Sequence, residues 1–326
     1  MRSAQKSTLK TFILNNVSPV KEPVSTKMAD GGALLWCCNW KKNELFSEIN
    51  LYINFAQHLQ LDTIIFDGYQ SSTKDSIHQK RSGKISQTVE INDLNPCPAE
   101  RSIFLSNYKN KNDFVRLLAL KLQNNGFKVI CCPSDADTSI VKLALEINNV
   151  ESVTIYSDDT DILCLLMHHV HTGAQSQGIF LKTLTRNKAT DQRVCYKIQN
   201  VVNTSDDTLL NYVLFAHTFT GCDTTSAIHN FGKTTIFTKL KNSNELKSTA
   251  DLFYQENIST DDIGKGAIRF FELLHSPCFN LKQIRKHKYD EMVASDRASI
   301  DPALLPPSPR AAYYHGLRVY HQMKVW

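Results

Sequence analysis

The sequence has little of what marks fibrous, secreted or membrane proteins. It contains only 12 glycines and 10 prolines among 326 residues, which excludes a collagen-like or linker-dominated chain. No apolar run approaches the ~20 residues that a membrane-spanning helix requires. The apolar patch near the N-terminus is too short for the core of a secretory signal peptide. We therefore expect an intracellular protein without a transmembrane segment.

The cysteines lack the spacing of a zinc site. The sequence has nine of them and no CxxC pair, so a zinc ribbon or finger is not expected. Several lie in apolar runs such as ILCLL, where a free cysteine packs as a small hydrophobic residue. An odd number of cysteines without a secretory signal indicates reduced thiols inside a cell.

The charge balance is mildly basic. The chain has 37 Lys and Arg against 32 Asp and Glu, a formal net charge of +5. Such an excess fits a polyanionic partner but is also common in unrelated proteins. The positions of the charges are therefore better evidence for such a partner than the net charge.

What the sequence does contain is an alternation of strand and helix patterns. Apolar runs typical of buried strands lie at 63–66, 129–132 and 152–156, whereas residues 24–29 (VSTKMA) have only a weak strand pattern. Helical stripes lie in 44–59 and in a segment that begins at an expected N-cap, Asn112. With 42% hydrophobic residues the chain can bury a core. The alternation predicts an α/β fold with a parallel sheet flanked by helices and right-handed crossovers.

The same patterns divide the chain into regions. Residues 178–183 and 193–198 are expected to pair as a hairpin at the sheet edge. The predicted regions are a flexible basic arm at 1–25, an α/β catalytic domain at 26–203 with a polar insert at 70–111, a helical region at 204–300, and a Pro-rich linker with a short helix at 301–326.

Aspartates follow the predicted strands. Asp67 stands after TIIF, Asp135 and Asp137 follow VICC, and Asp159 and Asp161 follow VTIY. In a parallel α/β sheet the carboxyl ends of the strands share one edge, where ligands bind. Any one of these residues could simply cap a helix or form a turn. Their recurrence at successive strand ends favours a common site.

Carboxylates gathered at one edge repel one another unless a cation neutralises them. Oxygen ligands of this kind suit Mg²⁺ or Mn²⁺. The i, i+2 spacing within each aspartate pair lets both members face one site. The cluster predicts a site for two ions that activates a water and stabilises the leaving oxygen of a phosphodiester. No small-molecule cofactor is expected.

Five segments in order along residues 26–245 resemble the motifs of the flap-endonuclease (XPG-type) nucleases: MADGG, IIFDG, PSDADTSIVKLAL, YSDDTDILCLL and GCDTTSAIHNFGKTTIF. The resemblance implies a PIN-like catalytic fold and a helix–two-turn–helix at 222–240, and it extends to invertebrate relatives that carry the phrase GCDTTSA. Asp135 and Asp137 stand where the family has paired glutamates. The metal ligands implied by the resemblance are Asp30, Asp67, Asp135, Asp137, Asp159, Asp161 and Asp223.

The resemblance also implies roles for basic residues near the scissile phosphate. Lys74 and Arg81 stand seven and fourteen positions after Asp67, a spacing that the family uses for catalytic cations. On a helix this spacing places both on one face, where Arg can hold a phosphate bidentately and Lys supplies a point charge. A solvated surface helix shows the same pattern. His78 and Lys80 lie beside them and would add to a nucleic-acid-binding patch.

A second nucleic-acid contact is implied at the helix–two-turn–helix. Gly232, Lys233 and Thr234 fall in its hairpin, whose backbone amides bind duplex phosphodiesters in the family. Asn230 stands where the family has the first hairpin glycine. Because Asn tolerates left-handed backbone angles, the turn can form.

The leading interpretation is a Mg²⁺- or Mn²⁺-dependent nuclease that cleaves branched or ended DNA, or RNA, as a 5′ flap endonuclease or 5′-3′ exonuclease. The family role implies a nuclear protein of DNA repair, and we expect a monomer. A second hypothesis keeps the fold as a nucleic-acid- or protein-binding module with a degenerate site. A third is a haloacid-dehalogenase-like phosphatase, for which Asp159-Thr160-Asp161 fits, but Leu163 stands where that family has a small β-branched residue.

Overall fold

The computed structural model describes residues 6–38, 40, 44–68, 87–133, 135–173, 177–187, 190–295 and 300–326. They form two compact units. The first, here the sheet unit, spans Val17–Asn203; the second, the helical unit, combines the residues up to Asn16 with Thr204–Trp326. Each unit is described by itself.

The sheet unit is built on one six-stranded sheet with the order β3-β2-β1-β4-β5-β6. Its strands are β1 (Thr26–Asp30), β2 (Thr63–Phe66), β3 (Lys128–Cys131), β4 (Val153–Tyr156), β5 (Ile179–Lys182) and β6 (Cys195–Lys197). All neighbouring pairs are parallel except β5 with β6, which is antiparallel and lies at the edge. The predicted α/β fold and the predicted edge hairpin are confirmed.

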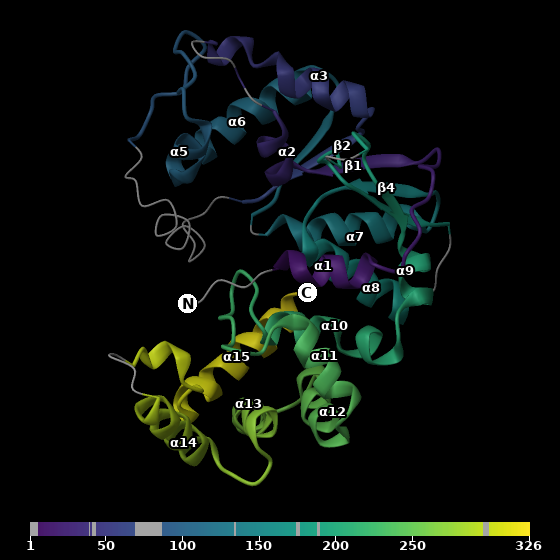
Figure 1. Cartoon of the computed structure of the whole chain (residues 1–326). Helices are drawn as coiled ribbons and strands as arrows, with labels where there is room; N and C mark the ends of the chain where they lie inside the picture. Colours follow the sequence, from purple (N-terminus) through teal and green to yellow (C-terminus); the bar gives the residue numbers. More distant parts are fainter. Residues whose placement is uncertain are drawn as a thin grey trace. The chain divides into compact units, whose positions relative to one another are not determined.

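Helices cover both faces of this sheet (Figure 1). They are α2 (Gly31–Cys37), α3 (Asn50–Leu59), α5 (Arg101–Ser106), α6 (Tyr108–Asn124), α7 (Ala136–Asn148), α8 (Thr160–Thr172) and α9 (Ile198–Thr204), with a 3-10 turn η1 at Phe46–Glu48. On one face α2, α3 and α6 enclose an aromatic core in which Phe114 contacts Trp40, Phe46, Tyr52 and Phe104. On the other face α7 packs against β1, β2 and β4.

Two helix boundaries differ from the sequence prediction. The expected helix over 44–59 is interrupted, because Leu45 forms an antiparallel bridge with Pro96 and the Phe46 N–H donates to the Asn95 carbonyl at 3.1 Å. This pairing holds the backbone outside an α-helix until α3 begins, and only the 3-10 turn η1 forms before it. The helix expected from Asn112 begins earlier, because the Asn107 side chain accepts the N–H groups at the start of α6 and caps it.

The helical unit packs its helices around phenylalanines. It comprises α1 (Lys6–Leu14), α10 (Asp207–Phe219), α11 (Lys233–Lys241), α12 (Asn244–Asp251), η2 (Leu252–Tyr254), α13 (Thr260–His275), α14 (Leu281–Ala294), η3 (Pro302–Leu304) and α15 (Pro309–Val325). Helix α1 lies in the region predicted as a flexible arm. Ring centroids of Phe219 and Phe270 are 4.6 Å apart, and Phe215 lies 4.9 Å from Phe253. In the described part of the chain, no helix combines the length and apolarity that crossing a membrane requires.

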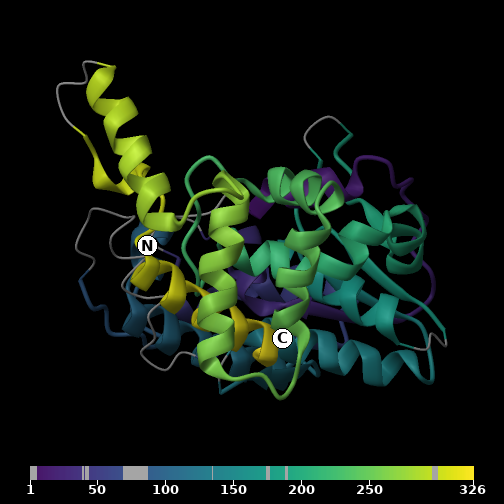
Figure 2. The ribbon, with the colours of Figure 1, turned by 90° about the horizontal axis from the view of Figure 1, so that it is seen from below.

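Helices α13 and α15 pack side by side at very short range (Figure 2). Gly316 of α15 makes this possible, because a Cβ placed there would lie 2.3 Å from the Cβ of Ala267 on α13. Glycine is therefore required by the close approach of the two helices rather than by a turn.

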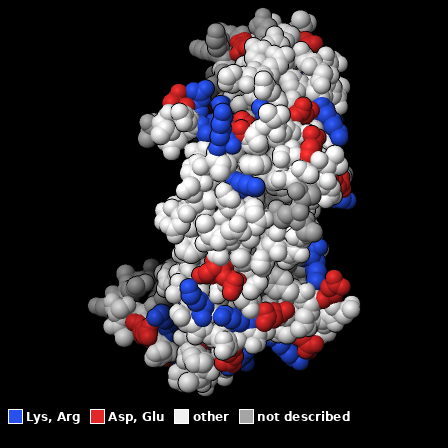
Figure 3. All heavy atoms as spheres, turned by 90° about the vertical axis from the view of Figure 1, so that its right-hand side faces the viewer, with Lys and Arg blue, Asp and Glu red and all other residues white. Residues whose placement is uncertain are grey.

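Acidic and basic side chains are interspersed on the face of the molecule drawn in Figure 3. On that face the basic excess of the sequence is not gathered into one patch. Some charged side chains instead form local networks of hydrogen bonds and ion pairs.

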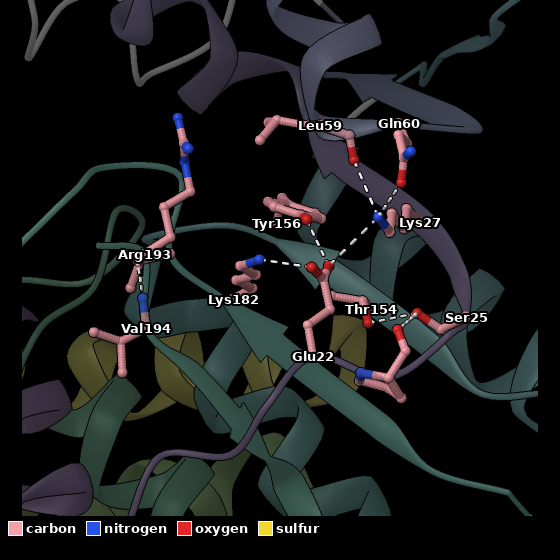
Figure 4. Close-up of polar contacts among 12 residues, drawn as sticks. Glu22, Ser25, Lys27, Leu59, Gln60, Thr154, Tyr156, Lys182, Arg193 and Val194 are labelled. Atoms are coloured by element: carbon pink, nitrogen blue, oxygen red, sulfur yellow. Dashed lines mark hydrogen bonds and ion pairs between the residues drawn. The ribbon is translucent and has the colours of Figure 1, made fainter. Parts of the chain in front are cut away.

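One such network connects side chains of the strands β1, β4 and β5 (Figure 4). The Glu22 carboxylate, in the segment before β1, accepts from the Tyr156 hydroxyl at 2.5 Å and from the Lys182 ammonium at 2.6 Å. Lys27 of β1 lies 3.9 Å away. Burial raises the pKa of Glu22, but the bonds from Lys182 and Tyr156 outweigh it, so the pKa lies below its ordinary value. The charged form of Glu22 therefore stabilises the fold.

We expect Glu22→Gln to lower the free energy of unfolding by about 2 kcal/mol at pH 7, because charge-assisted hydrogen bonds are lost. Since the folded-state pKa is lowered, this stabilisation is complete above the ordinary value of 4.5 and disappears as pH falls through the folded-state value. Urea denaturation at pH 7 and at about pH 3 measures both effects.

Glu146→Gln is the matched control, because Glu146 is exposed on α7. It should change stability by no more than about 0.5 kcal/mol at either pH. An equal loss in both variants, or a loss from Glu22→Gln that does not shrink in acid, would contradict the role given to this carboxylate.

Candidate metal centre

The predicted aspartates of the sheet unit lie at the carboxyl ends of four neighbouring parallel strands. Asp30 ends β1, Asp67 follows β2, Asp135 follows β3, and Asp159 follows β4. The chain order reverses direction at β1, whose neighbours are β2 and β4. This is the topological switch point at which α/β sheets bind ligands.

Three of the carboxylates form a tight cluster. Oxygens of Asp137, Asp159 and Asp161 all lie within 4.8 Å of one another. Asp137 and Asp161 are buried in the first turns of α7 and α8, and Asp159 is the N-cap of α8. Its Oδ1 accepts the N–H of Asp161 at 2.8 Å, which fixes the orientation of the Asp159 carboxylate.

Asp30 and Asp67 lie close to each other at the ends of the neighbouring strands β1 and β2. Asp30 Oδ1 accepts the Ala33 N–H at 3.1 Å as the N-cap of α2, and Asp67 Oδ1 accepts the Ala136 N–H at 2.9 Å. A Cβ on Gly32 would lie 3.2 Å from Asp30 Oδ1 and 3.5 Å from Asp67 Oδ2. The glycine therefore sits directly beside both carboxylates.

Burial and mutual repulsion disfavour the charged forms of two of these acids. Burial raises the pKa of Asp30 to about 7, with further contributions from Asp67 and Asp159. The pKa of Asp137 is raised well above its ordinary value by burial and then by Asp159 and Asp135. The carboxylates therefore lie close enough to repel one another, and a bound cation would reduce this repulsion.

Ser157 belongs to this site and was not predicted from the sequence. Its buried hydroxyl donates to Asp30 Oδ2 at 3.3 Å and accepts the Asp159 N–H at 3.0 Å. It links the ends of β1 and β4 across the switch point. Its position directly after VTIY could have indicated a site residue. Serine at a strand end is also an ordinary turn residue, however, so the sequence alone did not distinguish the two roles.

Asp158 lies between the two predicted ligands of this segment but is bound elsewhere. Its Oδ2 accepts from both the N–H and the hydroxyl of Thr185, each at 2.9 Å. In the run Ser157-Asp158-Asp159 the neighbouring carboxylates are thus held by different partners.

The backbone also constrains the site at Gly68. A Cβ there would lie 2.0 Å from the Cys132 carbonyl oxygen and 2.4 Å from Pro133 C. Only glycine lets the turn after β2 approach the turn after β3, and this approach brings Asp67 to the N-terminus of α7.

The remaining predicted residues lie in the helical unit or outside the described residues. Asp223 belongs to the helical unit, where its carboxylate pairs with Lys6 of α1 at 2.9 Å. Lys74, Lys80 and Arg81 lie outside the described residues.

A tight turn forms before α11, but the residues predicted to lie in the hairpin begin the helix instead, and residues 221–232 contain no helix. Asn230 has φ +63°, which confirms that it takes the left-handed conformation, and Ile228 pairs with Phe231. Gly232 is the N-cap of α11, and Thr234 lies in its first turn.

Lys233 is 5% exposed, and its ammonium points into the helical unit. It donates to the carbonyls of His217 and Gly221 at 2.8 and 2.7 Å, at the C-terminal end of α10. A cation at this position stabilises the partial negative charge of the helix end. The ammonium of Lys233 thus has a structural role inside the unit.

The comparisons with known proteins give structural matches only. No model of a known protein family matches the chain, and no curated protein matches it. The catalytic core of Rad2 in complex with a DNA substrate is 13% identical, with 94% of this chain and 85% of that chain covered and a TM-score of 0.48. A 5′-exonuclease of T5 with bound divalent metal ions (zinc) is 14% identical, with 83% and 98% covered and a TM-score of 0.42.

A flap endonuclease of bacteriophage T5 in complex with DNA and metal ions is 13% identical, with 91% of this chain and 99% of that chain covered and a TM-score of 0.41. These solved structures are nucleases, the class that the sequence motifs resemble. Because the TM-scores lie below 0.5, the functional proposal is built on the geometry of the carboxylates.

We expect Mg²⁺ or Mn²⁺ to raise the thermal stability of the protein, by about 2.7 kcal/mol at a concentration 100 times the Kd. Asp137→Asn should be more stable than the wild type without metal, because one repelling carboxylate is removed, and should gain less from metal.

Asp158→Asn is the control and should keep the metal-dependent gain, because Asp158 binds Thr185. Thermal unfolding with EDTA and with each metal measures both effects. An equal gain in Asp137→Asn and wild type would contradict the assignment.

Ser157→Ala should weaken Mn²⁺ binding by about tenfold or more, because the hydroxyl that orients Asp30 and Asp159 is removed. Mn²⁺ titration by calorimetry measures the change. Thr183→Ala, which removes a hydroxyl that binds the Val194 N–H in the edge hairpin, should leave the affinity unchanged. If both variants bind Mn²⁺ like the wild type, Ser157 does not support the ligands.

Proposed function

We propose that this chain is a Mg²⁺- or Mn²⁺-dependent nuclease that hydrolyses phosphodiester bonds in DNA. The observation that carries the proposal is the cluster of Asp137, Asp159 and Asp161, whose carboxylate oxygens lie within 4.8 Å of one another. Burial of such a cluster is costly unless a cation is bound, so a stable protein needs a functional reason to keep it.

The donor set fits a hard divalent cation. Every candidate ligand at this edge of the sheet is a carboxylate oxygen, which suits Mg²⁺ and Mn²⁺. Asp137, Asp159 and Asp161 would hold a first ion, and Asp30, Asp67 and Asp135 lie around them for a second. When bound, such ions activate water and stabilise the charge that develops on phosphate oxygens during phosphodiester hydrolysis.

The protein's own contribution is orientation. The Ala136 N–H fixes Asp67, the Asp161 N–H fixes Asp159, and Ser157 fixes Asp30. Each bond immobilises a carboxylate before a ligand arrives. The free-energy cost of reorienting the carboxylates on cation binding is therefore small, as expected of a preorganised electrostatic site.

The motif resemblance extends the proposal to residues outside this cluster. Lys74 and Arg81 would contact the scissile phosphate, and Lys80 would add to the same basic surface. Asp223 would be a further metal ligand. Gly232 and Thr234 would bind duplex phosphodiesters through their backbone N–H groups, because the Lys233 ammonium is turned inward. A structure-selective action on DNA ends or flaps in the nucleus belongs to the same proposal.

Cleavage of end-labelled DNA tests the proposal. The substrates are a 5′ flap, a single strand and a blunt duplex, each with EDTA, Mg²⁺ or Mn²⁺. We expect metal-dependent cleavage that falls by about 100-fold or more in Asp161→Asn, because a buried ligand is lost. Asp158→Asn serves as the neighbouring control and should retain the activity. Product lengths distinguish endonuclease from exonuclease action.

Three outcomes would overturn the proposal. Cleavage that persists in EDTA or in Asp161→Asn would place the activity elsewhere or in a contaminant. Absence of both cleavage and metal binding would favour a binding module with this fold. Metal-dependent hydrolysis of a small phosphomonoester without cleavage of DNA would favour a phosphatase.

A further inference from the structure

The helical unit contains a cavity of about 580 Å³ that the catalytic proposal does not use. It is lined by the hairpin residues 226–230, by one face each of α13, α14 and α15, and by the segment 302–308. In Figure 2, α14 and residues 300–308 lie at one end of the helical unit. Small-molecule pockets in proteins commonly have volumes of about 300–1,000 Å³.

The charged residues that line this cavity are all basic. They are Arg285, Lys288 and Arg318, and no Asp or Glu is among the described lining residues. The Arg318 side chain is exposed, and its guanidinium forms no hydrogen bond or ion pair with any residue that the structure describes. Lys288 pairs with Glu291 at 2.5 Å, but both side chains are over 40% exposed, so the pair is weak. The cavity therefore presents net positive charge.

The other polar lining residues are Ser226, Asn230, Ser308 and three histidines, His229, His275 and His315. Burial lowers the pKa of His275 and of His315 to about 4, so both imidazoles are neutral at physiological pH. His315 bonds to the Phe219 carbonyl at 2.9 Å, whereas His275 has a buried Nε2 without a hydrogen-bond partner among the described residues. An unpaired buried nitrogen costs stability, and sites that bind ligands tolerate this cost.

Part of the cavity wall is apolar. Leu304, Pro306, Pro307 and Phe271 line it. Proline fixes the backbone φ angle, and Arg285 Nη1 donates to the Pro306 carbonyl, which ties the wall to α14. Only this one of the five guanidinium N–H donors of Arg285 is engaged with a described residue, so the others can face an anion.

We propose that this cavity binds a nucleoside monophosphate, with the phosphate against Arg285, Lys288 and Arg318 and the base on the proline and leucine wall. Basic and apolar side chains in one cavity suit an anionic group that carries a flat organic body. The cavity exceeds what a lone inorganic phosphate would fill. The ligand is either a free nucleotide or the terminal nucleotide of a strand, which share this chemistry. None of the residues given a role in cleavage above lines the cavity, so binding there can be measured without cleavage.

Calorimetric titration in EDTA tests the proposal without any cleavage. The probes are dAMP and deoxyadenosine for the free ligand, and oligonucleotides with a terminal phosphate or hydroxyl for the strand end. We expect the phosphorylated member of at least one pair to bind about tenfold more tightly or better, since charge-assisted hydrogen bonds to the phosphate are gained. The pair that shows the difference identifies the source of the nucleotide.

Arg318→Ala should weaken this binding by about tenfold without affecting folding, since the exposed guanidinium forms no hydrogen bond or ion pair with a described residue. Arg310→Ala is the control, because Arg310 lies on the same helix but packs over Tyr314 and does not line the cavity. It should change the affinity by no more than about twofold. Equal binding with and without phosphate in both pairs, or equal effects of the two variants, would overturn the proposal. Loss of cleavage in Asp161→Asn has no bearing on either result.

Discussion

The repulsion among buried carboxylates is the constraint on which the sheet unit depends. Asp137, Asp159 and Asp161 come from two helix starts and one cap, yet their oxygens converge within 4.8 Å. The helix N-termini offset part of the repulsion, because their free N–H groups and dipoles favour negative charge. The two helices follow β3 and β4, which are separated in the sheet by β2 and β1, and α7 packs across β1, β2 and β4 so that its first turn meets that of α8.

The capping and ligand roles of the aspartates are compatible with each other. Asp30 and Asp159 each use one oxygen to accept a helix N–H. A cap holds the carboxylate rigidly at the strand end, which is also what a metal ligand requires. The ordinary structural role of aspartate thus prepares the site, and a substitution by Asn could keep much of the cap while removing the charge.

Much of this arrangement could be predicted from the sequence, because apolar runs followed by aspartates fix both strand and site. The sequence pattern was least informative where long-range contacts decide the structure. Residues 24–29 have only a weak strand pattern, but the chain forms the central strand β1 there, because β2 and β4 supply hydrogen bonds to it from both sides. Ser157 carries no pattern of its own, and the inward turn of Lys233 depends on the end of α10. Asn230 was predictable, because its backbone tolerance is a local property.

The buried ammonium of Lys233 has a chemical consequence. Three oxygens accept from it, on His217, Gly221 and Thr220, and it is shielded from water. An acylating reagent modifies only the unprotonated, accessible form of an amine, so this lysine reacts only when α10 and α11 separate. Its labelling rate, set against that of exposed lysines such as Lys282, therefore reports how often the helical unit opens between these two helices.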